Sequence, residues 1–307
     1  MMLDPLVRIK KAINNLNPHQ IHAMSEWPVR VALHAQSQEA YQGMENFFLQ
    51  DLTPARRRES ALQLVRAPIP VPAQEFDIPI YDENIAAPRG ALVFRSSHPR
   101  GLVERMLAEH PDHGIALAKS FLPFRRPFVE RVIAKTCREN TFFSITTALP
   151  DVIPNIIELP WAVAEFASDT AFLTMNQVHM AFLIAAASDR DVGYLQQKSE
   201  IAAVIGSAFG WRALARQLVG KIPFGAGLVA KAAVAYAGTR VLGLSLDRFY
   251  SIGFTYTRAE RDRLYTDAFH QGKKIAIKMI SHFRPDLAAK YAAVSGDSVT
   301  AIAKSSR

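Results

Sequence analysis

Three carboxylates in an apolar stretch are the residues of this sequence best placed to do chemistry. Glu158, Glu165 and Asp169 lie among isoleucine, leucine, valine, tryptophan and phenylalanine residues. Positions seven or four apart share a helix face, so the three acids would lie close together. Paired acids can transfer protons or bind a cation, which keeps an enzyme site between two domains as an alternative. We predict instead that they pair with arginines of the facing helices, because buried charges are normally paired: Arg212, Arg216 and Arg240.

Histidine pairs and a lone cysteine are the next candidates. His19 and His22, and likewise His110 and His113, have the i, i+3 spacing that can start a metal site. The first pair has no evident third ligand, and the second spans a proline that favours a turn. Cys137 is the only cysteine, so no intramolecular disulfide can form, and it lies on the apolar side of a predicted helix. We predict that Cys137 is a small buried residue and that the chain has no metal site and no cofactor.

A phosphate-binding loop would follow the first predicted strand, residues 29–33. Such loops need glycines, whose backbone N–H groups surround the phosphate, and a lysine that neutralises it. Residues 34–43 instead read HAQSQEAYQG, with no lysine and no glycine before Gly43. The sequence therefore excludes a working phosphate loop and leaves at most a weak anion site at Ser37, which is predicted to cap a helix.

A second glycine pattern could bind a dinucleotide. It reads G-x-G-x-x-A from Gly225, and Asp247 follows about 20 residues later, as in dinucleotide-binding domains. However, Pro223 breaks the strand that should come before the pattern, and residues 211–219 are typical of a helix. We predict that residues 225–230 form a helix–helix turn.

Basic residues outnumber acidic ones in both halves of the chain. The formal net charge is +8 and the pI is near 9.6, which suits a nucleic acid or an acidic bilayer. Residues 1–150 carry 18 basic against 15 acidic residues, and residues 151–307 carry 18 against 13. Since a nucleic-acid surface needs a local basic stripe, we do not predict nucleic-acid binding. The one tight basic run, residues 56–58, points to three sides of a helix and is predicted to be solvated.

The region 201–246 is rich in alanine and glycine, and small residues at such density let helix backbones approach closely. Its isolated cations would face acidic lipid headgroups, at about 1 kcal/mol each, or the internal acids. These candidate contact residues are Arg212, Arg216, Lys221, Lys231 and Arg240.

Whether these helices pack in water or at a lipid surface is left open by the sequence. Residues 170–188 form an uncharged run of 19, but the run contains Asn176, Gln177 and His179, which disfavour a straight membrane span. The two alternatives are a buried soluble helical core and a shallow, hairpin-like association with a membrane.

The hydrophobic pattern predicts two halves of different fold. Strands are expected at 29–33, 76–81 and 91–94, the second at a sheet edge because it contains Pro79. Helices are expected after the caps Ser37 and Thr53 and from Pro99. Strands alternating with helices indicate at least one parallel pair. Beyond residue 127 the period is helical, and a capping box opens a long helix at Thr257 that ends before residue 285.

The predicted fold class is therefore mixed α+β or α/β, with a small Rossmann-like layer followed by an all-helical domain rich in small residues. The expected segments are a helical arm at 1–28, the α/β domain at 29–122, a helical domain at 123–256, an amphipathic helix at 257–290 and a flexible tail at 291–307. The chain begins without an apolar signal-peptide region, which predicts a cytoplasmic protein.

An ordered set of short motifs carries a family resemblance over about residues 140–253. The motifs are Ala148-Leu-Pro-Asp-Val-Ile-Pro154 with Pro150, the pair Gln177 and Met180, Arg212-x-x-x-Arg216, Ile222-Pro-Phe-Gly-Ala-Gly227 with Pro223, Gly225 and Gly227, Ala235-Tyr-Ala-Gly-Thr239, Leu242-Gly243 and Tyr250. This set resembles the YcjF-type domain of unknown function. The resemblance implies a helical, GTPase-associated and membrane-associated module, and it carries no catalytic residues over to this chain. The α/β region upstream resembles a degenerate nucleotide-binding layer or an unrelated Rossmann-like one.

The expected function is a non-enzymatic scaffold or regulatory protein at or near the cytoplasmic face of the membrane. The expected partner is a protein, with a GTPase as the candidate, and an anionic membrane surface and self-association are left open. The alternatives are the acidic enzyme site and, more weakly, nucleic-acid binding.

Overall fold

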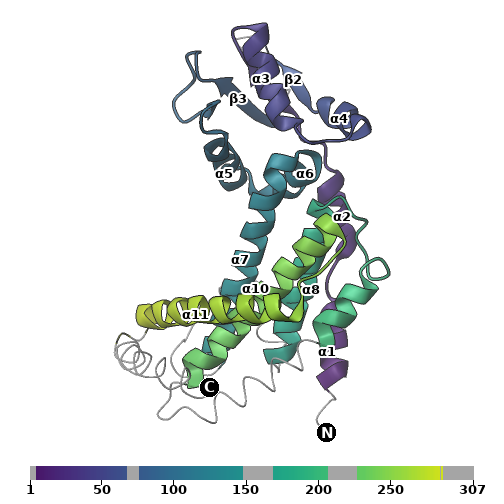
Figure 1. The fold of residues 1–307 in the computed structure, drawn as a ribbon, viewed down its shortest axis with the longest axis vertical. Helices are drawn as coiled ribbons and strands as arrows, with labels where there is room; N and C mark the ends of the chain where they lie inside the picture. Colours follow the sequence, from purple (N-terminus) through teal and green to yellow (C-terminus); the bar gives the residue numbers. More distant parts are fainter. Residues whose placement is uncertain (1–4, 68–75, 148–168, 207–226, 284, 286–307) are drawn as a thin grey trace. The chain divides into compact units, whose positions relative to one another are not determined.

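The computed structural model describes residues 5–67, 76–147, 169–206, 227–283 and 285 (Figure 1). The chain divides into two compact units. The α/β unit comprises Pro18–Arg131 and Leu183–Gly193, and the helical unit comprises Met1–Asn17, Val132–Phe182 and Tyr194–Arg307. These units reflect packing within the fold, and the segment boundaries expected from the sequence stay predictions.

The α/β unit contains a parallel sheet. Its strands are β1 (Val31–His34), β2 (Leu64–Arg66), β3 (Ile78–Asp82) and β4 (Leu92–Phe94), in the order β2-β1-β3-β4. Every neighbouring pair is parallel. The three predicted strands and the parallel pairing are confirmed. The sequence reasoning missed β2, which has only three residues and no alternation long enough to detect.

The prediction that Pro79 places its strand at an edge is wrong, because β3 lies between β1 and β4. The N–H of Ile78 donates to the Arg30 carbonyl on the β1 side at 3.2 Å. Successive residues of a parallel strand point their N–H groups to opposite neighbours, so the missing N–H of Pro79 belongs to the β4 side. The pairing with β4 starts only at Ile80, opposite Leu92, so Pro79 removes no ladder hydrogen bond.

The helices of the α/β unit are α2 (Pro18–Glu26), α3 (Gln38–Phe48), α4 (Pro54–Ala61), α5 (Pro99–Glu109), the short η1 (Pro111–His113) and α6 (Gly114–Ser120). Three of them begin where the sequence predicts: α3 after Ser37, α4 after Thr53 and α5 at Pro99. Ser37 accepts the Ala40 N–H at 3.1 Å at the start of α3, and Thr53 accepts the Arg56 N–H at 3.4 Å at the start of α4. Both predicted N-caps are confirmed.

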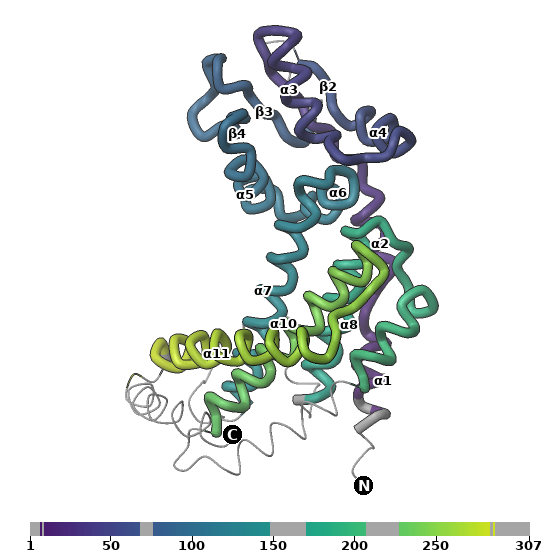
Figure 2. Tube along the Cα trace, viewed as in Figure 1, coloured from purple at the N-terminus to yellow at the C-terminus, as the bar shows by residue number. Residues whose placement is uncertain are grey.

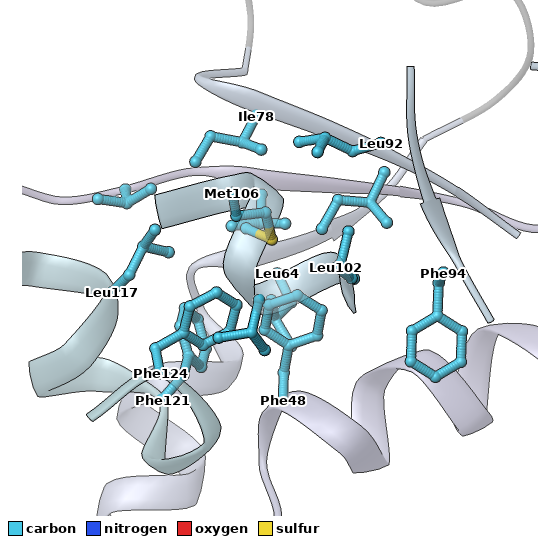
Figure 3. Packing of buried hydrophobic residues seen from close by; sticks show 14 of the residues in the cluster. Phe48, Leu64, Ile78, Leu92, Phe94, Leu102, Met106, Leu117, Phe121 and Phe124 are labelled. Atoms are coloured by element: carbon cyan, nitrogen blue, oxygen red, sulfur yellow. The ribbon is translucent and has the colours of Figure 1, made fainter. Parts of the chain in front are cut away.

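The core of the α/β unit lies on one face of the sheet. Val31 and Leu33 of β1 share this face with Ile78 and Ile80 of β3, since they are partners in register. Three rings complete the core from the helices: the Phe48 ring lies 5.1 Å from that of Phe121 and 5.6 Å from that of Phe124 (Figure 3). The opposite face therefore receives the alternate residues, which include His34 and Tyr81.

The helical unit is built from long helices. They are α1 (Pro5–Asn14), α7 (Leu122–Thr146), α8 (Asp169–Ala187), α10 (Gly227–Ile252) and α11 (Arg258–Phe283), and residues 198–206 are also helical. The division between the units falls within α7 and within α8. The Tyr194 hydroxyl lies 2.8 Å from the Ile13 carbonyl oxygen and 2.7 Å from that of Leu16, and so closes the end of α1.

Small residues set how closely these helices approach. Helix α11 packs on α10 (Figures 1 and 2), and a Cβ added at Gly272 would lie 2.9 Å from the Tyr236 Cβ and 3.1 Å from the Ala233 Cα. A Cβ added at Gly243 of α10 would lie 2.7 Å from the Cγ1 of Ile133 in α7. Both contacts are closer than carbon atoms normally approach, so a side chain at either place would force its neighbour to shift.

One described helix is long and apolar enough to cross a membrane. It is Thr170–Ala187 of α8, with a mean hydropathy of 1.3, and 83% of it is buried inside the protein. A buried core helix passes the same test of length and composition, so this finding does not decide between the two alternatives.

Candidate functional site

His34 is the most unusual polar residue at the carboxyl end of the sheet. It is the last residue of β1, is 1% exposed, and stacks on Tyr81 of β3 with ring centroids 4.4 Å apart and planes at 9°. Among the described residues, neither ring nitrogen of His34 has a hydrogen-bond partner. Burial lowers the pKa of His34 below the ordinary 6.5, so the ring is neutral at pH 7 and carries one donor and one acceptor.

The position of His34 in the sheet adds to its interest. In open parallel sheets, ligands bind beyond the carboxyl ends of the strands where the strand order reverses. Here the chain passes from β1 outward to β2 and then returns to β3 on the other side of β1. His34 and Tyr81 are partners in register on the two strands that flank this point.

The charged side chains at the same edge are used to close their own loops. The Oδ2 of Asp82 accepts the Asn84 N–H at 3.3 Å and its side-chain amide at 3.1 Å. Glu83 accepts the backbone N–H and the hydroxyl of Ser96 at 3.2 and 3.1 Å. The Arg66 guanidinium donates to the Gln38 side chain and lies 5.4 Å from the Tyr41 ring centroid. These side chains therefore bond within and between the loops at this edge, and none of them bonds to His34.

Buried amide and hydroxyl groups join three helices of the helical unit. The side-chain amide of Asn140 in α7 donates to the Thr239 hydroxyl of α10 at 2.9 Å, and Gln177 of α8 donates to the same oxygen at 3.0 Å. Asn176 of α8 donates to the Oδ1 of Asn140 at 3.0 Å, and the Thr239 hydroxyl donates to the Ala235 carbonyl at 2.8 Å. We call Asn140, Asn176, Gln177 and Thr239 the amide layer. All four are at most 6% exposed.

Cys137 lies in the same unit. It is buried, as predicted, and its thiol lies 3.6 Å from the Tyr236 carbonyl oxygen. Burial raises the pKa of Cys137 to about 12, although the nearby Arg240 and Arg138 oppose the shift. A thiol with this pKa is almost wholly protonated at pH 7 and is a poor nucleophile.

The turn between α10 and α11 exposes apolar side chains. Phe249, Ile252 and Phe254 are 37%, 56% and 74% exposed, and we call these three residues the apolar turn. The capping box predicted at its end is confirmed: the Glu260 carboxylate accepts the Thr257 N–H at 2.7 Å, and the Thr257 hydroxyl accepts the Glu260 N–H at 3.3 Å.

The predicted contact residues are only partly described. Lys231 lies in the first turn of α10, and its Nζ is 3.4 Å from the Thr147 hydroxyl. Arg240 is half-buried, and its positive charge opposes the rise in the pKa values of Tyr236 and Cys137, which lie in the same unit. The other three cations lie outside the described residues: Arg212, Arg216 and Lys221.

The acid cluster and the family-like motif are also only partly described. Glu158 and Glu165 lie outside the described residues, and of Asp169 only the backbone is described, at the start of α8. Of the motif, these three residues also lie outside: Pro150, Pro223 and Gly225. Gly227 is the first residue of α10, and four of the described motif residues are buried in α8 and α10: Gln177, Met180, Thr239 and Gly243.

The basic run contacts its own chain, His22 lies 4.0 Å from the Glu26 carboxylate, and the His110 and His113 ring centroids lie 6.2 Å apart. Arg56 pairs with Glu59 at 2.7 Å and with Asp189, and Arg57 donates to the Asn46 side chain at 2.8 Å. Arg56 and Arg57 are partly exposed and Arg58 is exposed, so the run lies at the surface as predicted, although Asp189 and Asn46 also contact it. Across the described ranges, no group of three histidine, cysteine or acidic residues could hold a metal ion.

Comparison with protein families, curated proteins and solved structures gives no match to this chain. The resemblance to the YcjF-type domain therefore stays a prediction. The same holds for the GTPase partner, the membrane and the cytoplasmic location. The coarse fold class, helices together with a small parallel sheet, is confirmed.

Proposed function

We propose that this chain is a non-enzymatic scaffold or regulatory protein whose helical unit binds a protein partner near the cytoplasmic face of the membrane. The candidate partner is a GTPase, as the resemblance to the YcjF-type domain implies. The observation that carries the proposal is the amide layer, because it commits the polar side chains of three helices to packing.

A scaffold needs a fixed surface, and the helical unit has the means to keep one. Satisfied buried polar groups allow one relative rotation of the helices and penalise others, since every alternative leaves amides without partners. The glycine contacts of α10 with α7 and α11 fix the spacing as well. A partner that docks on such a surface loses little affinity to reorganisation of the protein.

For the α/β unit, we propose a Rossmann-like origin without phosphate binding. The parallel strand order agrees with such a layer. The sequence leaves a weak anion site only at Ser37. The Ser37 hydroxyl oxygen already accepts a hydrogen bond from the Ala40 N–H. This unit would then support the scaffold rather than hydrolyse a nucleotide.

The test is recovery of the partner from the native host. The tagged full chain is cross-linked in cells and purified at low and high salt, with an unrelated tagged protein of equal net charge as the control. We expect one protein, a GTPase if the resemblance holds, to be recovered in stoichiometric amount at both salt concentrations. Recovery of the same proteins with the control would contradict the proposal, since charge alone would then explain binding.

The sheet edge favours a second function, the binding of an uncharged small molecule by His34. The orphaned donor and acceptor of His34 cost about 1–3 kcal/mol each when unsatisfied, and a ligand with complementary groups would recover this. Native mass spectrometry of the full chain from its host tests the idea. A bound mass present in the wild type and absent from His34→Phe supports it, and the same bound mass on both proteins, or none on the wild type, refutes it.

The acidic enzyme site remains the alternative from the sequence. It depends on Glu158, Glu165 and the side chain of Asp169, for which there is no described geometry. It therefore has no described contact or distance in its favour.

A further inference from the structure

Among the described residues of the helical unit, the apolar turn is the largest group of neighbouring exposed apolar side chains. Phe249, Ile252 and Phe254 fall within six residues at the end of a helical hairpin. Elsewhere, large exposed apolar residues stand singly or beside one half-exposed ring, as Leu62 at 83% and Leu195 at 84% do. Single exposed residues are ordinary, whereas a contiguous group marks a contact surface.

The turn is held in one conformation before any contact is made. The Arg248 guanidinium lies 4.5 Å from the Tyr256 ring centroid and donates to Glu260 at 3.2 Å. Gly253 takes a φ of +79°, which only glycine adopts without strain, and its N–H donates to the Phe249 carbonyl at 2.8 Å. The three apolar side chains are thus presented at little further cost in conformational entropy.

The charges beside the turn are mainly positive. In the first two turns of α11, Arg258, Arg261 and Arg263 are exposed and form no ion pair within the described structure. Of the two acids there, Glu260 is paired with Arg248 and Asp262 is exposed. The chain as a whole carries +8. An apolar end flanked by cations is complementary to an anionic lipid surface, where rings enter the headgroup region and arginines remain among the phosphates.

We infer that the apolar turn docks the helical unit on an anionic lipid bilayer by shallow insertion of Phe249, Ile252 and Phe254. The inference rests on the proposed scaffold function and names the surface on which the scaffold would sit. Apolar contact supplies the insertion, and Arg258 and Arg261 supply the preference for anionic lipid. Because the arginine contribution is electrostatic, binding weakens as salt is raised.

The experiment measures binding of the full chain to vesicles. Vesicles of phosphatidylcholine with phosphatidylglycerol are compared with vesicles of phosphatidylcholine alone, by co-sedimentation. We expect binding to the anionic vesicles, an about 10-fold loss for Phe254→Ser, and an about 5-fold loss for Arg258→Gln. The matched controls Leu62→Ser and Leu195→Ser remove equally exposed apolar side chains and leave binding unchanged.

A probe at the turn separates insertion from attraction at a distance. In Phe254→Cys the new thiol is exposed, whereas Cys137 is buried with its pKa raised to about 12, so a polarity-sensitive dye labels the turn alone. We expect the dye emission to shift to the blue on anionic vesicles. Unshifted emission, or equal binding by Phe254→Ser and wild type, overturns the inference.

The two proposals fail separately. If the partner protein is recovered from cells but vesicles are not bound, the lipid inference is wrong and the scaffold stands. If Phe254→Ser loses the partner protein while vesicle binding is absent, the turn is a protein site, which also overturns the lipid inference. Vesicle binding without any recovered partner keeps the lipid inference and removes the scaffold.

Discussion

The amide layer and the sheet edge bury polar side chains in opposite ways. In the amide layer, the Thr239 oxygen receives two amide donors and gives its own proton to a carbonyl. At the sheet edge, His34 is as deeply buried and its two nitrogens have no described partner. A satisfied polar group specifies structure, whereas an orphaned one lowers stability unless something outside the fold completes it. The contrast assigns a structural role to the amide layer and a potential binding role to His34.

The largest expected effect comes from the centre of the amide layer. Thr239→Val removes the oxygen that accepts from Asn140 and Gln177, and two buried amides lose a partner. We expect the free energy of unfolding to fall by about 3 kcal/mol, measured by chemical denaturation. Thr239→Ser keeps the oxygen and should lose about 1 kcal/mol or less. A loss of about 1 kcal/mol or less for Thr239→Val would show that these hydrogen bonds contribute little to stability.

A second substitution tests whether close packing, like the amide layer, is structural. Gly272→Ala places a methyl against the backbone of Ala233, and we expect a loss of about 1–2 kcal/mol in thermal unfolding. Gly43→Ala in α3 is the matched control, because nothing lies within 4 Å of its added Cβ. There the higher helix propensity of alanine should stabilise by about 0.5–1 kcal/mol. Effects of the same sign at both sites would count against close packing.

At the sheet edge we expect a substitution to raise the free energy of unfolding, whereas the substitutions in the helical unit lower it. His34→Phe keeps a ring that can stack on Tyr81 and removes both orphaned nitrogens, so the free energy of unfolding of the purified chain should rise by about 1 kcal/mol. A fall of similar size, measured in the same denaturant titration, would mean that His34 has a partner that the described residues do not supply.

The smallest effect is a pH dependence. The pKa of His34 is lowered by burial, so between the folded pKa and 6.5 the unfolded chain binds more protons. Stability is therefore complete above pH 6.5 and falls as the pH decreases, by at most about 1.4 kcal/mol per pH unit. His110 and His179 also have lowered pKa values, so the measured quantity is the difference between wild type and His34→Phe. A difference that is constant from pH 7.5 to 5.5 would contradict the assignment.

Local signals in the sequence were enough to predict most described elements. The caps Ser37, Thr53 and Thr257 each announce a helix through a hydrogen bond to a residue three positions on, so their prediction needs no tertiary information. The same holds for burial of Cys137, which follows from its place on an apolar helix face.

Features that depend on distant partners could not be predicted. The place of Pro79 inside the sheet depends on where β4 begins, which its own strand does not encode. The polar residues of α7, α8 and α10 are far apart in sequence, and periodicity does not say which amide meets which hydroxyl. The sequence does not single out His34, because a polar residue at the end of a strand is ordinary and its lack of partners is visible only in the structure.

The Tyr194 hydroxyl has a consequence for synthesis of the chain. It meets the carbonyls of Ile13 and Leu16 across 181 and 178 positions of sequence. At a ribosomal rate of about 5–20 residues per second, the first helix waits roughly ten to forty seconds for the residue that completes it. During that interval the sheet, whose strands all lie before residue 95, can assemble first. Helix α1 is therefore completed only after the strands of the sheet have been synthesised.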